Sequence, residues 1–169
     1  SPVPVYGKHK LLAEAACFAE QPDSVILRLT WMYGKLTEKE RRKGRRNLAD
    51  TLAEMCLLSP EKAEKKKQTF LTTDYRGVTD VTEVVRQMEA AWKLPPGIYN
   101  FGSSASGSMY ENITRALEGT PSEALAEPLA GTEGPRNLIM DPEKTADARI
   151  HFPDTAEGIR RYVERHLKN

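Results

Sequence analysis

A short aliphatic run most constrains the fold of this chain. Residues 24–29 (SVILRL) are too few for a helix, and they are apolar on both faces, as in a central strand of a parallel sheet. A helical pattern precedes them at residues 6–20 and ends at the turn QPD. A second strand-like run, residues 98–101 (IYNF), leads through the segment GSSASGS into another helical pattern. Strands that alternate with helices predict an α/β protein with parallel pairing.

The remaining segments continue this alternation. Apolar residues at helical spacing predict three more helices, at residues 47–58, 81–92 and 155–167, and a helix start at Pro142. The β-branched and aliphatic content of residues 68–72 (QTFLT) predicts a strand, and residues 137–141 (NLIMD) form a short apolar run. With 169 residues, the chain is expected to form one compact unit.

Two segments are expected to lack regular structure. Residues 34–46 (GKLTEKERRKGRR) contain seven basic and two acidic residues and almost nothing to bury, which predicts an exposed, mobile loop. Residues 120–135 form a looser stretch rich in Ala, Pro and Gly. Ser108 and Glu111, by contrast, have the spacing of a capping box and predict where the helix after GSSASGS begins.

Composition and charge exclude several classes of function. The net charge of +1 argues against a nucleic-acid-binding protein, because neutralising phosphates requires a surplus of Lys and Arg. No apolar run approaches the roughly 18–20 residues that cross a bilayer, so we expect a soluble, cytoplasmic protein without membrane contact. Cys17 and Cys56 lie in helical patterns and are expected to be buried thiols of a reducing compartment. His9, His151 and His166 lack ligand spacing, which predicts no metal site.

Tyr6 and Lys10 form the motif with the most direct chemical meaning. Four residues apart on a helix, their side chains emerge on the same face. A phenol is a poor proton donor at neutral pH unless a neighbouring ammonium group stabilises its anion, so this pair suits an acid catalyst. Both residue types are common, and the spacing alone is therefore weak evidence.

The surroundings of this pair resemble a known family. The segments YGKHKLLAE (residues 6–14) and RLTWMYG (residues 28–34) resemble the extended short-chain dehydrogenase/reductase superfamily. More narrowly they resemble the dTDP-4-dehydrorhamnose reductase branch, whose members show YG-x-x-K-x-x-x-E and then R-[TS]-x-W-x-YG. Residues 97–102 (GIYNFG), Tyr110 with Glu111, and residues 135–141 (PRNLIMD) resemble later elements of that branch. The similarity spans nearly the whole chain.

The resemblance implies roles for individual residues. Tyr6 would protonate the carbonyl oxygen of a sugar while a nicotinamide, NAD or NADP, delivers hydride, and Lys10 would hold the nicotinamide ribose. Tyr6, Lys10 and Thr30 are thus the expected cofactor-binding residues. Trp31 is expected to line the sugar end of the cleft, although a lone Trp after a strand is more often a packing residue outside this family context. The expected substrate-binding residues, including arginines that could meet a diphosphate, are Trp31, Arg45, Arg46 and Arg136.

The resemblance also implies how the chain is organised. It resembles the C-terminal part of a Rossmann-like NAD(P)-binding fold plus the substrate-binding lobe, without the N-terminal glycine-rich dinucleotide unit. The eleven glycines form no G-x-G-x-x-G, and GSSASGS lacks the Lys of a P-loop, so it is interpreted as a β-to-α turn. The expected division is a catalytic helix and core strand at residues 1–34, a core strand at 97–102, and a mainly substrate-binding lobe at 35–96 and 103–169. The cofactor site is expected to be incomplete, and the isolated chain inactive.

Departures from the branch leave two functions open. The D-Q-x-G-x-P-T element of the branch corresponds to DYRGVTD (residues 74–80), and Gly134 stands where the branch has Arg, with Arg136 two positions later. The first hypothesis is NAD(P)-dependent reduction of a nucleotide-linked 4-keto sugar, as in dTDP-rhamnose biosynthesis. The alternative is a non-catalytic module that binds a sugar nucleotide or a protein partner. Unpaired edges of the two core strands further predict self-association or binding to a separate N-terminal half.

Overall fold

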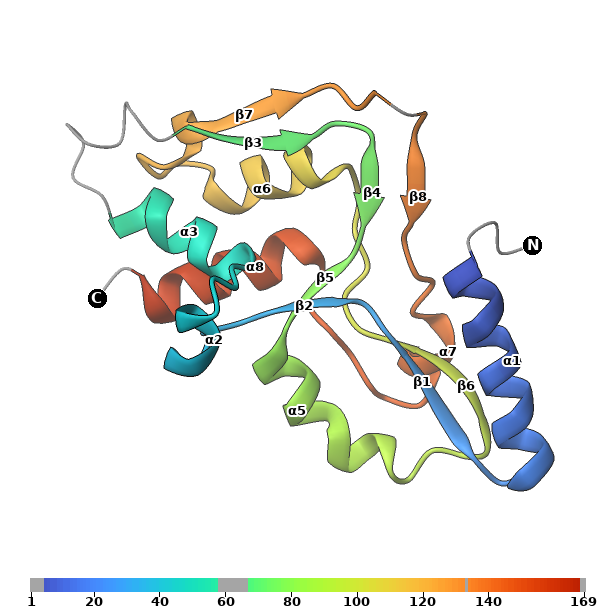
Figure 1. The fold of residues 1–169 in the computed structure, drawn as a ribbon. Helices are drawn as coiled ribbons and strands as arrows, with labels where there is room; N and C mark the ends of the chain where they lie inside the picture. The colour runs from blue at the N-terminus through green and yellow to red at the C-terminus, as the bar shows by residue number, and fades with distance from the viewer. Residues whose placement is uncertain (1–4, 58–66, 133, 168–169) are drawn as a thin grey trace.

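A computed structural model describes residues 5–57, 67–132 and 134–167 (Figure 1). Every strand pair in these ranges is parallel, which confirms the predicted α/β class. The strands are β1 (Val25–Leu29), β2 (Trp31–Tyr33), β3 (Gln68–Leu71), β4 (Asp74–Arg76), β5 (Val78–Asp80), β6 (Gly97–Phe101), β7 (Ala126–Leu129) and β8 (Arg136–Leu138). The helices are α1 (Val5–Glu20), α2 (Glu38–Arg42), α3 (Leu48–Leu57), α5 (Val81–Ala91), α6 (Met109–Leu117), α7 (Glu143–Asp147) and α8 (Thr155–His166), with a 3-10 turn, η1 (Glu123–Leu125).

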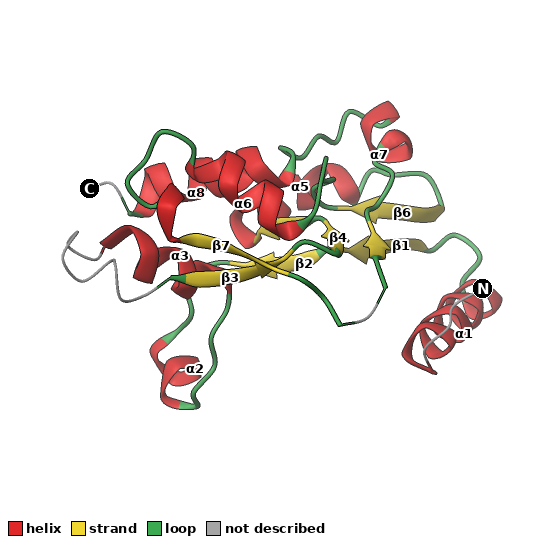
Figure 2. Ribbon diagram, turned by 90° about the horizontal axis from the view of Figure 1, so that it is seen from above, coloured by secondary structure: helices red, strands yellow, loops and turns green. Residues whose placement is uncertain are grey.

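The strands pair across long sequence distances. β1 pairs with β6, β2 with β5, β3 with β7, and β4 with β8. Thr30 alone separates β1 from β2, and Gly77 alone separates β4 from β5, so the chain changes its pairing partner at these two residues. Viewed from above, the strands form a middle layer with α5, α6, α7 and α8 on one side and α1 and α2 on the other (Figure 2).

Two groups of buried side chains hold the layers together. The larger packs α3, α6 and α8 around β2 and β5, and it includes Leu52, Ile113 and Ile159. Tyr33 of β2 meets Tyr162 of α8 edge to face, with ring centroids 5.4 Å apart. The smaller group packs α5 against β6. Asp154 caps the N-terminus of α8, where its carboxylate accepts a hydrogen bond from the backbone N–H of Glu157, and the apolar face of this helix is buried. The larger core therefore fixes β2 and β5 relative to α3, α6 and α8, and the smaller one fixes β6 relative to α5.

Helix α1 packs little against the rest of the chain. None of its sixteen residues is buried, and Figure 2 shows it set apart from the other helices. The Glu14 carboxylate and the Arg28 guanidinium form two hydrogen bonds, of 2.7 and 2.6 Å, between α1 and β1. The expectation that Cys17 is buried was wrong: Cys17 is exposed because the described structure provides no surface against its side of α1, while Cys56 is half-buried.

The two segments expected to be irregular contain regular structure. The basic loop, residues 34–46, includes helix α2, because Thr37 and Glu40 form a capping box that compensates for the lack of apolar residues. The stretch 120–135 includes η1 and strand β7, which pairs with β3. Strands β2, β4 and β5 have three residues each, too few for alternation to be visible in the sequence. Tertiary pairing stabilises these short strands.

Candidate functional site

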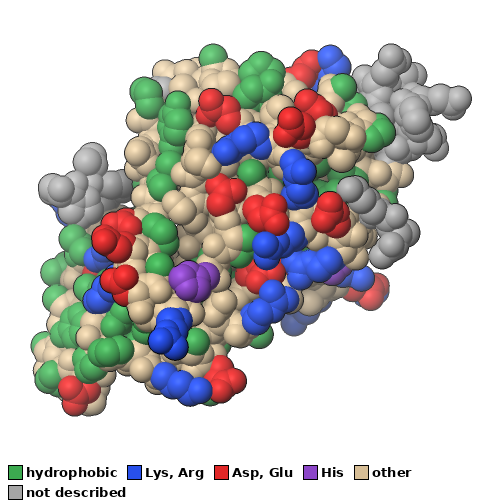
Figure 3. All heavy atoms as spheres, turned by 180° about the vertical axis from the view of Figure 1, so that it is seen from behind, with side chains coloured by type: hydrophobic (Ala, Val, Ile, Leu, Met, Phe, Trp, Pro, Cys, Tyr) green, Lys and Arg blue, Asp and Glu red, His purple; other side chains and the backbone are tan. Residues whose placement is uncertain are grey.

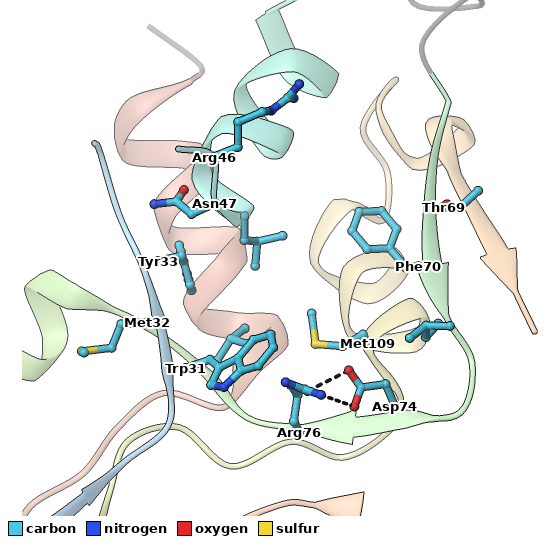
Figure 4. A pocket seen from close by; sticks show the side chains of 13 residues that line it. Trp31, Met32, Tyr33, Arg46, Asn47, Thr69, Phe70, Asp74, Arg76 and Met109 are labelled. Carbon is cyan, nitrogen blue, oxygen red and sulfur yellow. Dashed lines mark hydrogen bonds and ion pairs between the residues drawn. The ribbon is translucent and has the colours of Figure 1, made fainter. Parts of the chain in front are cut away.

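A cavity of about 440 Å³ opens beside β2, between α3, β3, β4 and α6 (Figure 4). Its walls are largely apolar, and its polar lining is concentrated in a few side chains. The segments that form it are far apart in the sequence, from Trp31 to Met109, and they come together only in the folded chain. The lining residues are Trp31, Met32, Tyr33, Arg46, Asn47, Leu48, Thr69, Phe70, Leu71, Asp74, Arg76, Val78 and Met109.

Arg76 is the buried cation of this cavity. Its side chain is 7% exposed, and its Nη2 donates a hydrogen bond of 2.7 Å to Oδ1 of Asp74. Its Nε lies 2.7 Å from Oδ2 of the same carboxylate, at ion-pair distance. The guanidinium carbon lies 3.8 Å from the centroid of the Trp31 ring, so the cation covers one face of the indole. Figure 4 shows the guanidinium between the Trp31 ring and the Asp74 carboxylate.

The local sequence explains this arrangement. Asp74 and Arg76 are two residues apart in β4, and residues at that spacing point to the same face of a strand. Gly77 follows directly, and a Cβ at that position would lie 1.9 Å from the backbone oxygen of Ser103. Only glycine therefore allows β4 and β5 to pass this close to the turn after β6.

Trp31 and Tyr33 line the cavity from β2 but differ in exposure. Trp31 is 67% exposed, so the part of its ring that Arg76 does not cover is open to a ligand. Tyr33 is buried, and burial together with the nearby Asp80 carboxylate raises the pKa of its phenol above the usual value. Tyr33 therefore stays protonated and takes no part as an acid at neutral pH.

Thr30 is buried and forms a polar cluster with Thr79 and the backbone of Ser103, which we call the polar joint. Its Oγ1 is 2.5 Å from Oγ1 of Thr79 in β5, and the Thr79 oxygen also accepts a 2.8 Å hydrogen bond from the backbone N–H of Ser103. The joint ties the break between β1 and β2 to β5 and to the turn after β6. The assignment of Thr30 to cofactor binding stays a prediction, and its hydroxyl is engaged within the protein.

The four predicted substrate-binding residues occupy different positions. Trp31 and Arg46 line the cavity, although the Arg46 Nη2 lies 2.6 Å from Oε1 of Glu54. Arg136 lines an adjoining cavity of about 230 Å³ that shares Leu71, Asp74 and Arg76 with the first. The side chain of Arg45 extends toward Glu40 of α2, with 3.5 Å between Nη1 and Oε1, and it is not among the residues that line either cavity. The structure thus groups three of the four around β4.

Tyr6 and Lys10 lie together in the first turns of α1. Tyr6 is 71% exposed, and Nζ of Lys10 is 5.4 Å from the centroid of its ring. Both groups are accessible to a ligand that approaches the exposed face of α1. Their proximity follows from the helical spacing, and the catalytic roles remain predictions.

Sequence analysis missed part of the cavity. Asp74 and Arg76 appeared there only as part of the segment that corresponds to the D-Q-x-G-x-P-T element, with no role of their own, and Phe70 and Met109 were assigned to secondary structure alone. One signal was available: an acidic and a basic residue two apart in a strand share a face and can form an ion pair. No comparable signal marks Phe70 or Met109, because which apolar residues face a cavity depends on tertiary packing.

Within the described ranges, two further features are absent. No helix there has the length and apolar character needed to cross a membrane. No three His, Cys, Asp or Glu side chains of those residues converge in a way that would hold a metal ion. The back of the molecule carries Lys and Arg side chains interspersed with Asp and Glu (Figure 3).

Comparisons with known proteins place this geometry in context. The family model described as RmlD substrate binding domain matches residues 1–166. The spore coat polysaccharide biosynthesis protein SpsK of Bacillus subtilis is 27% identical over 172 residues, which cover 96% of this chain and 55% of SpsK. The chain therefore spans about half the length of this relative.

Solved structures share the fold at lower identity. A dTDP-4-dehydrorhamnose reductase from Clostridium acetobutylicum has a TM-score of 0.65 at 15% identity, and the match covers 97% of this chain and 56% of that one. The Helicobacter pylori ADP-L-glycero-D-manno-heptose-6-epimerase has a TM-score of 0.60 at 20% identity, with coverages of 98% and 51%. WbmG of Bordetella bronchiseptica, solved with NAD and UDP, has a TM-score of 0.63 at 19% identity, with coverages of 98% and 51%.

These matches confirm the expected fold, the C-terminal half of a Rossmann-like protein. They also confirm the resemblance on which the predicted roles of Tyr6 and Lys10 depend. The chain belongs to the RmlD substrate binding domain family.

Proposed function

We propose that the polypeptide containing this chain is an NAD(P)-dependent oxidoreductase that reduces a nucleotide-linked 4-keto sugar, as a dTDP-4-dehydrorhamnose reductase does. The observation that carries the proposal is the position of the cavity. Trp31, on its wall, follows the carboxyl end of β1 by two residues, and ligands of open α/β sheets bind beyond the carboxyl ends of parallel strands. Membership of the RmlD substrate binding domain family supports the same class of substrate.

The chemistry assigns separate tasks to this chain and to the cofactor. A bound nicotinamide supplies hydride to the carbonyl carbon of the sugar. The Tyr6 phenol donates the proton that the carbonyl oxygen takes up, so the ketone becomes an alcohol and the phenol becomes a phenolate. The Lys10 ammonium, beside the Tyr6 ring, stabilises that phenolate and binds the nicotinamide ribose. Both side chains are exposed, as groups that must reach a substrate and a cofactor have to be.

The division of the chain follows from these tasks. We assign residues 1–34 to the catalytic helix and a core strand, residues 97–102 to a second core strand, and residues 35–96 and 103–169 mainly to substrate binding. We assign Arg46, at the rim of the cavity, and Arg136, in the adjoining one, to contacts with the diphosphate of the substrate.

The experiment starts with the intact mass of the polypeptide that carries this sequence in its own cell. That polypeptide is then assayed for oxidation of NADPH and NADH with nucleotide-linked 4-keto sugars. Tyr6→Phe is expected to lower kcat by about 100-fold or more, since a positioned acid contributes roughly 10²- to 10⁴-fold. The matched control Tyr110→Phe, on α6, is expected to remain within about threefold of wild type. If Tyr6→Phe also remains within threefold, the acid role of Tyr6 is wrong.

One observation favours a second candidate, a non-catalytic module that binds a sugar nucleotide or a protein partner. The Thr30 hydroxyl, one of the predicted cofactor contacts, is buried against Thr79. Calorimetry with dTDP-sugars and with NADPH, together with the turnover assay, separates the two candidates. Sugar-nucleotide binding without turnover of any keto sugar supports the module, and turnover that depends on Tyr6 supports the reductase.

A further inference from the structure

The basic loop, residues 34–46, begins and ends at the cavity. Tyr33, directly before the loop, and Arg46 and Asn47, at its end, line the cavity (Figure 4). The Asn47 Nδ2 donates a hydrogen bond of 2.9 Å to the backbone oxygen of Gly34, and this bond holds the two ends of the loop together. A surface segment of this length with close ends has the dimensions of an Ω-loop. The loop is thus anchored at the rim of the proposed substrate cavity.

Positive charge is concentrated on this loop. Its seven basic and two acidic residues give it a net charge of +5, whereas the whole chain has +1 and the rest of the sequence therefore −4. None of the residues of α2, the helix within the loop, is buried, so the charges lie in solvent. A group of like charges beside a cleft attracts ions of the opposite sign and raises the rate at which they arrive.

The arginines of the loop are neutralised by carboxylates, and the lysines are not. The ion pairs are Arg41 with Asp50, Arg42 with Glu38, Arg45 with Glu40 and Arg46 with Glu54. Lys35, Lys39 and Lys43 are exposed, and none of them forms an ion pair with a described residue. The three lysines therefore account for the positive charge that remains at the rim.

The course of the chain keeps these lysines near the cavity. Lys35 is two residues from Tyr33, and Lys43 is three residues from Arg46. The backbone spans at most about 3.6 Å per residue, so the Cα atoms of these two pairs lie within about 7 and 11 Å of each other. These separations are close to the Debye length, about 8 Å at physiological ionic strength. An anion at the mouth of the cavity is therefore attracted by the lysines without touching them.

The size of the cavity favours a small anion over a macromolecule. Its volume of about 440 Å³ is in the range of sites for small ligands, and its walls are largely apolar. The diphosphate of a nucleotide-linked sugar carries the negative charge on which the field of the loop acts. The base and the sugar contribute no such charge, so the attraction acts on the diphosphate wherever it binds within the cavity.

We propose that Lys35, Lys39 and Lys43 form an electrostatic guide that speeds the entry of a nucleoside diphosphate ligand into the cavity without contacting the bound ligand. The inference rests on the proposed function, because it takes the substrate to be nucleotide-linked. Charges at a rim change the association rate and its dependence on salt, whereas groups that contact the ligand change the dissociation rate. The guide therefore acts on kon and leaves koff unchanged.

The test measures kon and koff for dTDP by stopped-flow tryptophan fluorescence, since Trp31 lines the cavity. It uses the longest polypeptide that carries this sequence in its own cell, without nicotinamide. Measurements at about 0.01 M and about 1 M salt change the Debye length from about 30 to about 3 Å. The glutamine variant combines Lys35→Gln, Lys39→Gln and Lys43→Gln, and the arginine variant places Arg at the same three positions.

A control variant removes the same amount of positive charge elsewhere. It combines Arg86→Gln, Lys93→Gln and Arg161→Gln, three exposed residues on or directly after α5 and on α8. These helices lie on the opposite side of the strand layer from α2 (Figure 2), and none of the three residues lines the cavity. Circular dichroism verifies that each variant is folded.

The expected results separate steering from contact. At about 0.01 M salt, the glutamine variant should lower kon about fivefold or more while koff stays within about twofold of wild type. At about 1 M salt, its kon should lie within about twofold of wild type because the field is screened. The arginine variant should keep the wild-type kon, since steering depends on charge rather than on the shape of the donor. The control variant should change kon by less than about twofold.

Four results would overturn the proposal. An equal drop in kon for the control variant would assign the attraction to net charge rather than to the loop. A rise in koff for the glutamine variant would mean that the lysines contact the bound ligand. An unchanged kon at low salt would leave the lysines without this role, and failure of wild type to bind dTDP would remove the nucleotide ligand. A lack of reductase turnover with salt-dependent association intact, by contrast, would count against the proposed reaction alone.

Discussion

Thr79→Val tests the buried joint between the two parts of the sheet. Thr79 is 1% exposed, and its Oγ1 accepts a 2.8 Å hydrogen bond from the N–H of Ser103 and lies 2.5 Å from the hydroxyl of Thr30. Valine has nearly the same shape but no hydroxyl, so the substitution leaves no large cavity. It removes the partner of two buried groups, the Ser103 N–H and the Thr30 hydroxyl.

The expected cost follows from those two groups. Each buried polar group that loses its partner costs about 1–3 kcal/mol, which gives a total of about 2–6 kcal/mol. A domain of ordinary stability has about 5–15 kcal/mol in all, so the variant should lose a large share of its free energy of unfolding. Thr30→Val removes only one of the contacts of Thr79 and should cost about 1–2 kcal/mol.

Urea unfolding, followed by circular dichroism, measures these costs. The double variant Thr30→Val/Thr79→Val should cost less than the sum of the single variants by about 1 kcal/mol, because the Thr30 hydroxyl is no longer left unpaired. Thr114→Val is the matched control: its hydroxyl donates to the Tyr110 backbone oxygen within α6, and its loss should cost less than about 1 kcal/mol. A cost for Thr79→Val no greater than that of the control, or strict additivity in the double variant, would refute this account of the joint.

Three further predictions concern the residue between β4 and β5, the cavity wall and a helix cap. Gly77→Ala should destabilise the fold by about 3 kcal/mol or more in urea unfolding, because its Cβ would collide with a backbone oxygen; unchanged stability would contradict that close approach. Binding of dTDP should change tryptophan fluorescence through Trp31, so the signal should survive Trp92→Phe and vanish in Trp31→Phe. Hydrogen bonds from Ser108 lower the pKa of Glu111 below 4.5. The ionised Glu111 therefore stabilises the folded chain fully above pH 4.5, and this stabilisation is lost as the pH falls through the lowered pKa. The Tm of Glu111→Gln should lack this decline at acidic pH.

The candidate site was only partly predictable from the sequence. Trp31 and Arg46 were predicted from the family resemblance, and the structure places both on the cavity. The sequence alone did not show that Arg76 is buried against Trp31, because the two belong to different strands, forty-five positions apart, and meet only when β2 pairs with β5. Arg45 and Arg46 are neighbouring arginines in the same basic segment. Only the course of the chain after α2 turns Arg46 toward the cavity and leaves Arg45 beside Glu40.

Local interactions account for what the sequence determined by itself. The α/β class, the start of α6 at the Ser108 capping box and the proximity of Tyr6 to Lys10 all depend on residues within a few positions of one another. The tertiary structure decided which surfaces are covered, as the exposure of Cys17 and the pairing of β3 with β7 illustrate. Burial and long-range strand pairing depend on which distant segments pack together, and a three-residue strand or an isolated arginine has too few local contacts to specify that.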